Sequence, residues 1–168
     1  MDQISINRIN TLHPSLRAEA LEIYEKINKS LSSGVFCRIA YGLRTFEEQA
    51  ALYAQGRTKL YDATGKKLGK VTNAMAGQSI HNYGFALDIV LINGKSAAYE
   101  TNKDFDGDGI SDWMECVQIF KSYKWTWGGD WKSFKDMPHF EKSPLPLKQL
   151  QARYNAKNFI PNTTYINL

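Results

Sequence analysis

His81 and Asp88, which lie seven residues apart, are the first pair in this sequence with the chemistry of a metal site. A helix would separate them by about 10 Å along its axis, and one unbroken strand would place them on opposite faces. A turn over 82–84 followed by a strand over 85–92 instead lets His81 fold back towards Asp88. A carboxylate on so apolar a strand needs a cation or several donors. The pair therefore fits either a metal site or an aspartate that backbone amides satisfy beside an unrelated histidine.

A third group of the same kind occurs near the C-terminus, in the segment 136–141. Pro138 disfavours helix at the residue before it, so we expect His139 in an extended segment. Two histidines and one carboxylate, with a fourth position left to water, form the ligand set of a catalytic zinc site rather than a closed structural one. Asp136 is then placed to act as the general base, with Asp130 as its rival. Glu141 is placed to orient one of the metal ligands without itself binding the metal.

The two stretches together resemble a known family. The pattern Ser-x-His-x-x-Gly-x-Ala-x-Asp over 79–88, followed by Asp-x-x-His over 136–139, is similar to the zinc peptidases that cut peptidoglycan stem peptides. That family includes D-Ala-D-Ala carboxypeptidases and dipeptidases, and the L-alanyl-D-glutamate endopeptidases of many phage endolysins. The resemblance runs from about residue 12 to 141, and takes in Gly-Leu-Arg-Thr-Phe-Glu-Glu-Gln over 42–49 and Leu-Tyr-Ala-Gln-Gly-Arg-Thr over 52–58.

The resemblance implies a fold and a set of roles. The fold is α+β, with helices packed on a mostly antiparallel sheet, as in the signalling domain of Hedgehog proteins. The roles are zinc ligands at His81, Asp88 and His139, a general base at Asp136, and an oxyanion-holding arginine at Arg44. Without the resemblance, an ion pair with Glu47 or Glu48 would be the simpler explanation for Arg44. Ser79 either donates to the substrate or only satisfies the turn.

The segment 136–139 also bears on the reaction. Its sequence is Asp-x-x-His, whereas the carboxypeptidases and dipeptidases of the family have a pattern similar to Glu-x-x-His at this place. This difference favours an L-alanyl-D-glutamate endopeptidase acting on the peptidoglycan stem peptide. One alternative is a D-Ala-D-Ala carboxypeptidase or dipeptidase. Another, from a different class, is a catalytically silent zinc- and calcium-binding module like the Hedgehog domains.

Residues 104–115 form a second candidate metal site. Their spacing matches the calcium loop of an EF-hand, with oxygen ligands expected from Asp104, Asp106, Asp108, the Ile110 carbonyl, Asp112 and Glu115. Ser111 stands where an apolar residue is usual, which argues against pairing with a second such loop. We expect calcium to dock the following helix, fix a wall of the zinc cleft and switch the enzyme on. A merely solvated acidic loop is the alternative.

Composition limits the other functions. The chain has 168 residues, a net charge of +4 and a pI near 9.0, which suits contact with anionic wall polymers. No basic run is longer than Lys66-Lys67, so we do not expect nucleic-acid binding, and no apolar stretch is long enough to enter a membrane. Cys37 and Cys116 lie in apolar patterns and are expected to be buried thiols.

The domain organisation follows from the same survey. Residues 1–8 lack an apolar leader, and no wall-binding module is visible. We therefore expect one monomeric catalytic domain over 1–168. It would stay in the host cytoplasm until another phage protein permeabilises the membrane.

The local patterns predict the elements that position these residues. We expect helices over 14–31, 45–55, 112–122 and 144–156, the last with Ser143 as its N-cap. We expect strands over 35–43, 85–92 and 123–127, joined by a loop over 57–78 that forms one wall of the cleft. Alternation in the first strand turns five residues inward: Val35, Cys37, Ile39, Tyr41 and Leu43. His13, at the entrance of the first helix, is not expected to bind metal.

Overall fold

The computed structural model describes residues 2–32 and 34–168. In these residues the helices are α1 (Gln3–Ile9), α2 (Pro14–Ser30), α3 (Phe46–Ala54), α4 (Asp112–Ser122) and α5 (Leu147–Asn155). The strands are β1 (Val35–Tyr41), β2 (Ala86–Asn93), β3 (Ser96–Ala98), β4 (Thr126–Trp127) and β5 (His139–Glu141). Two short 3-10 helices, η1 (Ile80–Tyr83) and η2 (Gly128–Asp130), complete the elements.

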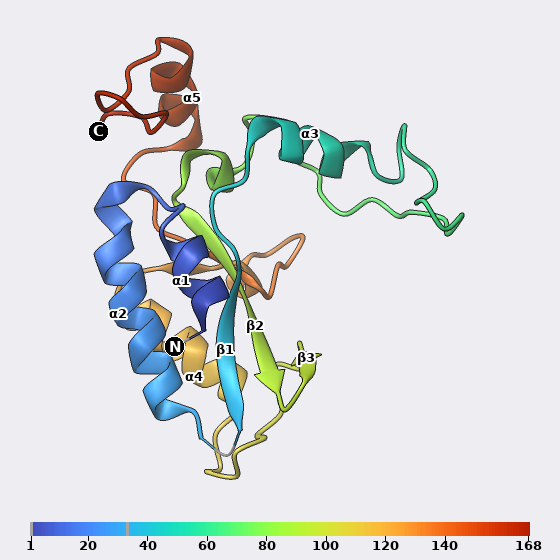
Figure 1. The fold of residues 1–168 in the computed structure, drawn as a ribbon, viewed down its shortest axis with the longest axis vertical. Helices are drawn as coiled ribbons and strands as arrows, with labels where there is room; N and C mark the ends of the chain where they lie inside the picture. The colour runs from blue at the N-terminus through green and yellow to red at the C-terminus, as the bar shows by residue number, and fades with distance from the viewer. Residues whose placement is uncertain (1, 33) are drawn as a thin grey trace.

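The strands form one antiparallel sheet in the order β1-β2-β5-β4, and β3 pairs with the end of β2. Helices α1, α2 and α4 cover one face of this sheet (Figure 1). Alternate residues along β2, beginning with the one just before it, face those helices and are fully buried: Phe85, Leu87, Ile89 and Leu91. The predicted α+β fold is confirmed, because the period-two alternation of β2 gives the helices an apolar face to cover.

Two helix starts follow from local chemistry. Pro14 occupies the first turn of α2, where its missing N–H costs nothing, and the His13 ring accepts a hydrogen bond from the Ser15 N–H. Thr45 and Glu48 form the predicted capping box of α3, each side chain accepting from the other's backbone N–H.

The first strand departs from its predicted alternation. Ile39 pairs with Ile89, but Tyr41 pairs with Asp88, so one extra residue is inserted in β1 between them. Such a bulge reverses the faces of the residues that follow it. Tyr41, predicted to face inward, is therefore 59% exposed, and the strand ends there rather than at residue 43.

The C-terminal helix starts later than predicted. Ser143 does not cap it; its hydroxyl donates to the Leu145 carbonyl, and α5 begins at Leu147. The reason is Pro146, because a residue before proline is driven to extended backbone and Leu145 cannot be helical. The predicted strand 123–127 also shrinks, to 126–127, since Lys124 has a φ of +65° at the end of α4. Helix α1 was not predicted, because seven residues are too few for a clear period.

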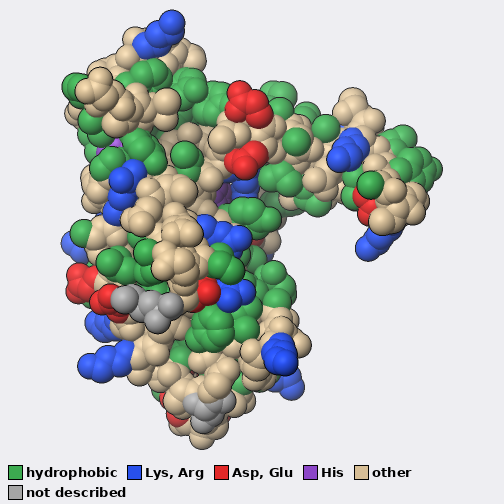
Figure 2. Space-filling view, in the orientation of Figure 1, with side chains coloured by type: hydrophobic (Ala, Val, Ile, Leu, Met, Phe, Trp, Pro, Cys, Tyr) green, Lys and Arg blue, Asp and Glu red, His purple; other side chains and the backbone are tan. Residues whose placement is uncertain are grey.

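Helix α3 and the segment 56–75 extend from the body of the molecule as an arm (Figure 1). The surface is hollowed between this arm and the body (Figure 2). The predicted hairpin near Thr64 is present, closed by a bridge between Tyr61 and Lys67. Cys37 and Cys116 are buried free thiols, as predicted. Among the described residues, no helix is both long and apolar enough to cross a membrane.

Candidate metal centre and active-site cleft

The structure brings His81, Asp88 and His139 together, with one ligand atom of each within 4.8 Å of the others. Asp88 and His139 are direct partners in the β2–β5 register, so their side chains share one face of the sheet. His81 Nε2 lies 3.2 Å from Asp88 Oδ1 and 3.1 Å from His139 Nδ1. His139 Nδ1 lies 3.4 Å from Asp88 Oδ1. The three atoms thus form a nearly equilateral triangle.

His81 reaches this triangle because the chain reverses at Gly84. Gly84 ends η1 with a φ of +77°, a left-handed conformation that glycine adopts without strain. A Cβ at Gly84 would also lie 2.6 Å from the His13 backbone nitrogen. The predicted fold-back of His81 over the turn is therefore what the structure contains, with glycine required on two grounds.

The outer nitrogens of both histidines have partners that fix the rings. His81 Nδ1 lies 2.8 Å from the Gly42 carbonyl oxygen, and His139 Nε2 lies 2.9 Å from Glu141 Oε2. Both partners accept hydrogen bonds, so each outer nitrogen carries the proton. With both rings neutral, the inner nitrogens, His81 Nε2 and His139 Nδ1, present lone pairs beside the Asp88 carboxylate. Three electron-rich atoms then converge on one point, which favours positive charge there, either a proton on His139 or a metal ion.

The size of the triangle fits zinc. Zinc binds histidine nitrogen and carboxylate oxygen at about 2.0–2.2 Å with tetrahedral angles, which puts neighbouring ligand atoms about 3.3 Å apart. The edges here are 3.1, 3.2 and 3.4 Å. The residues present therefore fit a zinc ion with one open position.

The charges of the site point the same way. Burial alone would raise the pKa of the Asp88 carboxyl, but His81 and His139 lower it well below its ordinary value. Burial would lower the pKa of His139, but its hydrogen bonds to Asp88 and Glu141 raise it to about 9. The surroundings thus favour positive charge at the centre of the triangle.

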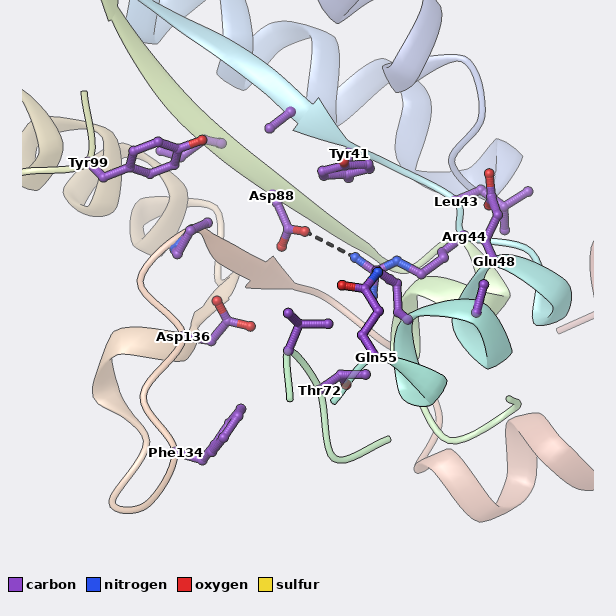
Figure 3. Close-up of a pocket in the computed structure, with 16 residues that line it drawn as sticks. Tyr41, Leu43, Arg44, Glu48, Gln55, Thr72, Asp88, Tyr99, Phe134 and Asp136 are labelled. Carbon is purple, nitrogen blue, oxygen red and sulfur yellow. Dashed lines mark hydrogen bonds and ion pairs between the residues drawn. The ribbon is translucent and has the colours of Figure 1, made fainter. Parts of the chain in front are cut away.

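Asp136 faces the same cleft from the loop before β5 (Figure 3). Its backbone N–H donates to the Gly128 carbonyl at 3.1 Å, which holds the loop in place. Its carboxylate accepts no hydrogen bond from residues 2–32 and 34–168. Burial, followed by the nearby Asp88 charge, raises its pKa above the ordinary value. A free carboxylate of raised pKa beside the metal centre has the properties of a general base.

Arg44 joins the cleft from the segment between β1 and α3. Its guanidinium donates to Asp88 Oδ2 at 3.4 Å (Figure 3). It also donates to Gln49 Oε1 at 3.1 Å. The alternative ion pair with Glu47 or Glu48 is not formed, since Glu48 accepts from the Thr45 N–H in the capping box. Arg44 therefore places a hydrogen-bond donor in the cleft beside the metal triangle.

The cleft consists of two adjoining cavities of about 530 Å³ and about 260 Å³. Both are lined by Arg44, Thr72, Asp88, Phe134 and Asp136. Ser79 lines the smaller cavity, which keeps both of its expected roles open. The arm supplies one wall through 71–74, as the sequence predicted for the loop over 57–78.

Comparisons with known proteins identify the family. A family model described as D-alanyl-D-alanine carboxypeptidase matches residues 72–142. Over 137 residues the chain is 42% identical to CwlK, the peptidoglycan L-alanyl-D-glutamate endopeptidase of Bacillus subtilis, covering 79% of this chain and 74% of CwlK. The chain belongs to the peptidase family that includes CwlK. The matched region contains the metal triangle and Asp136.

Two further relatives of this peptidase bear on fold and origin. It is 28% identical over 137 residues to the L-alanyl-D-glutamate peptidase of a Listeria phage, covering 82% of this chain but only 40% of the phage protein. The crystal structure of ChiX, an L-Ala D-Glu endopeptidase of Serratia marcescens, superposes with a TM-score of 0.54 at 20% identity, covering 85% of this chain and 89% of that one. That likeness shows the shared fold.

Two other candidate residues lie outside the peptidase cleft. Asp130 is about half exposed and pairs with Lys121 Nζ at 2.6 Å, lining neither cavity. His13 is buried, stacks on Phe85 and contacts the Ile166 carbonyl oxygen at 3.0 Å. His13 thus packs in the core and caps the start of α2.

The acidic loop 104–115 gathers its carboxylates in two overlapping groups. One is Asp104, Asp106 and Asp108; the other is Asp106, Asp112 and Glu115. The loop lies where β2 ends, tied to α2 by the Ser32 N–H, which donates to Asp106 at 3.0 Å (Figure 1). It lines neither cavity. Tyr99, just before the loop, lines the larger one.

Sequence reasoning missed several groups of the site. The Gly42 carbonyl is a backbone atom, for which the sequence carries no chemical signal. A Cβ at Gly42 would lie 2.6 Å from the Arg8 carbonyl oxygen, so the chain requires glycine there. This glycine, close to Arg44, was the signal in the sequence that could have pointed to the Gly42 carbonyl. The cleft aromatics Tyr99 and Phe134 gave no periodic signal, and the alternation of the first strand placed Tyr41 on the wrong face.

Proposed function

We propose that this peptidase is a zinc-dependent L-alanyl-D-glutamate endopeptidase that cuts peptidoglycan stem peptides. The observation that carries the proposal is the convergence of His81, Asp88 and His139, with their lone pairs turned inward, beside the free carboxylate of Asp136. The 42% identity to CwlK supports the L-alanyl-D-glutamate bond as the one that is cut. The Asp-x-x-His spacing over 136–139 favours the same choice.

On this proposal, the residues of the cleft have separate roles in the reaction. Zinc held by the triangle supplies Lewis acidity for the scissile carbonyl and for a water molecule. Asp136 accepts a proton from the attacking water and returns it to the leaving amine as the C–N bond breaks. Arg44 donates to the carbonyl oxygen as that oxygen gains negative charge. Glu141 and Gly42 hold the two histidine rings in the required tautomers.

The cleavage site can be read directly from the products. Purified peptidoglycan digested by the zinc-loaded enzyme should yield new C-terminal L-alanine and new N-terminal D-glutamate, measured by mass spectrometry. Released D-alanine would instead establish the D-Ala-D-Ala carboxypeptidase alternative. No hydrolysis of any wall peptide would leave only the silent Hedgehog-like module.

We also infer a role in host lysis, as an endolysin kept in the cytoplasm as a monomer until the membrane is permeabilised. The peptidase from a Listeria phage supports this role, although the chain spans less than half of that relative. The stem peptide is the partner on this proposal, and neither nucleic acid nor membrane takes part.

We further propose that the loop 104–115 binds calcium. Asp112 is fully buried, yet its Oδ1 has no hydrogen-bond partner in the described chain, and neither has Glu115 Oε2. Burial, followed by the charges of Asp108 and Asp106, raises the pKa of Glu115 to about 7. Buried carboxylate oxygens without donors are costly, and a calcium ion would satisfy them.

A chain of side-chain contacts connects the calcium loop to the cleft. Trp113, the first residue after Asp112, lies against Tyr99, with ring centroids 6.4 Å apart, and Tyr99 lines the larger cavity. Ordering of the loop would therefore favour one position of Tyr99. Calcium is scarce in cytoplasm and abundant outside, so this coupling would keep the enzyme quiet until lysis.

Calcium titration of the zinc-loaded enzyme should show binding by calorimetry at sub-millimolar concentration and a rise in the wall-lysis rate. Asp104→Asn should lose both, whereas Glu100→Gln, an exposed acid just before the loop, should keep both. The same dependence should hold in cells, with lysis only after permeabilisation in calcium-containing medium. Binding without a change in rate would make the site purely structural, and lysis of intact expressing cells would contradict the endolysin role.

A further inference from the structure

Three exposed aromatic rings surround the larger cavity of the cleft. Tyr41, Tyr99 and Phe134 are 59%, 57% and 62% exposed, and all three line this cavity. They come from the end of β1, the residue after β3, and the loop before β5 (Figure 3). Each exposed ring leaves a large apolar face in water, so three of them lining one cavity favour a binding role for that cavity.

These rings are held in place. The guanidinium groups of Arg8 and Arg44 lie 5.6 and 5.8 Å from the centroid of the Tyr41 ring. Tyr99 is backed by the buried Trp113. Phe134 has a φ of +54°, a conformation that costs free energy for a residue with a Cβ. Strained backbone of this kind is found most often at binding and active sites.

The two halves of the cleft differ in chemistry. The larger cavity adds apolar groups from the arm to the three rings, among them Leu52 and Val71. The smaller cavity shares Thr72 and Phe134 with the larger one and contains Trp131, but its own additions near the arm are amide and hydroxyl side chains: Asn73, Gln78 and Ser79. Arg44, Asp88 and Asp136 line both cavities, whereas His81 and His139 line only the smaller one, so the metal triangle opens into the smaller cavity beside its boundary with the larger. A peptide cut at the metal can therefore place one side of its scissile bond in each cavity.

The substrate proposed above is unsymmetrical in the same way. On one side of the bond, L-alanine carries only a methyl group, and its nitrogen is acylated by the lactyl ether of N-acetylmuramic acid. On the other side, D-glutamate carries a carboxylate. An alanyl residue fills only a small part of a cavity of about 530 Å³. Room remains for the sugar, and pockets of this size hold ligands larger than one residue.

We propose that the aromatic half of the cleft is a subsite for the muramyl sugar next to L-alanine, and that the polar half receives the D-glutamyl side. The proposal rests on the endopeptidase function. Sugar rings present C–H faces that pack on aromatic rings, and the two tyrosine hydroxyls add hydrogen bonds at the rim. Hydroxyl and amide donors suit the glutamyl carboxylate. The enzyme would thus select stem peptides still attached to glycan.

Two substrates test this subsite: N-acetylmuramyl-L-alanyl-D-glutamyl-L-lysine, and N-acetyl-L-alanyl-D-glutamyl-L-lysine, which lacks the sugar. The wild-type enzyme should show the higher kcat/KM for the muramyl substrate. Tyr99→Ala should lower the ratio of the two kcat/KM values about three- to tenfold, mainly through KM, because one aromatic contact contributes about that factor. Phe134→Ala should lower the ratio as well.

Tyr61→Ala is the matched control, since Tyr61 is equally exposed but lies on the arm away from both cavities. It should keep the wild-type ratio. Equal rates on both substrates in the wild type, or equal losses on both in Tyr99→Ala, would overturn the sugar subsite while leaving the endopeptidase intact. Failure to cut either substrate between alanine and glutamate would instead refute the proposed function.

Discussion

His139→Ala protein should be folded, free of zinc and inactive on the wall. The substitution removes one of three ligands from a site that has no other donor in the described residues. Zinc affinity should fall by more than the factor of about 10 to 100 that is lost when a residue that only hydrogen-bonds to a metal ligand is removed. Metal analysis after gel filtration and a turbidity assay on purified walls measure both results. His81→Ala and Asp88→Ala should behave alike.

Glu141→Gln supplies the graded comparison for this prediction. Its side chain still reaches His139 Nε2 but no longer carries a charge, so zinc should bind more weakly without being lost. Circular dichroism establishes that each variant is folded. Stoichiometric zinc in folded His139→Ala protein would remove His139 from the ligand set.

Asp136→Asn protein should retain one zinc ion and lose about a hundred- to ten-thousand-fold in kcat. Asparagine keeps the shape of the side chain but cannot take the proton from the attacking water. No hydrogen bond within the described residues depends on the Asp136 carboxylate, so the fold should be unaffected. Steady-state kinetics on a defined stem peptide, with metal content measured in the same samples, separates loss of the base from loss of the metal.

Asp130→Asn is the matched control, because Asp130 is the nearest rival carboxylate in the sequence and pairs with Lys121 instead. It should be nearly as active as the wild type. The reverse outcome, with Asp130→Asn inactive and Asp136→Asn active, would show that the general base has been assigned to the wrong aspartate.

The sequence alone predicted the parts of the fold that depend on local physics. The alternation of 85–92 gave β2 and its two faces, Thr45 and Glu48 gave the start of α3, and Pro14 gave the start of α2. Where a single residue interrupts a pattern, prediction was wrong. The bulge in β1 exposes Tyr41, and Pro146 moves the start of α5.

For the site, the sequence predicted the residue types and the family, because ligand chemistry is carried by side chains at fixed spacing. It also brought His81 back towards Asp88 through a turn that only glycine completes. The pairing of Asp88 with His139 across β2 and β5 joins residues 51 positions apart in the chain, and strand register decides it. No local pattern encodes that register.

Tertiary structure also decided what surrounds the metal centre. The Gly42 carbonyl fixes the His81 tautomer, and three rings from distant segments meet over one cavity. The sheet and the arm bring these groups together only after the chain has folded. Hydrophobic periodicity reports which face of an element is buried. It carries no information on which exposed groups become neighbours across the cleft.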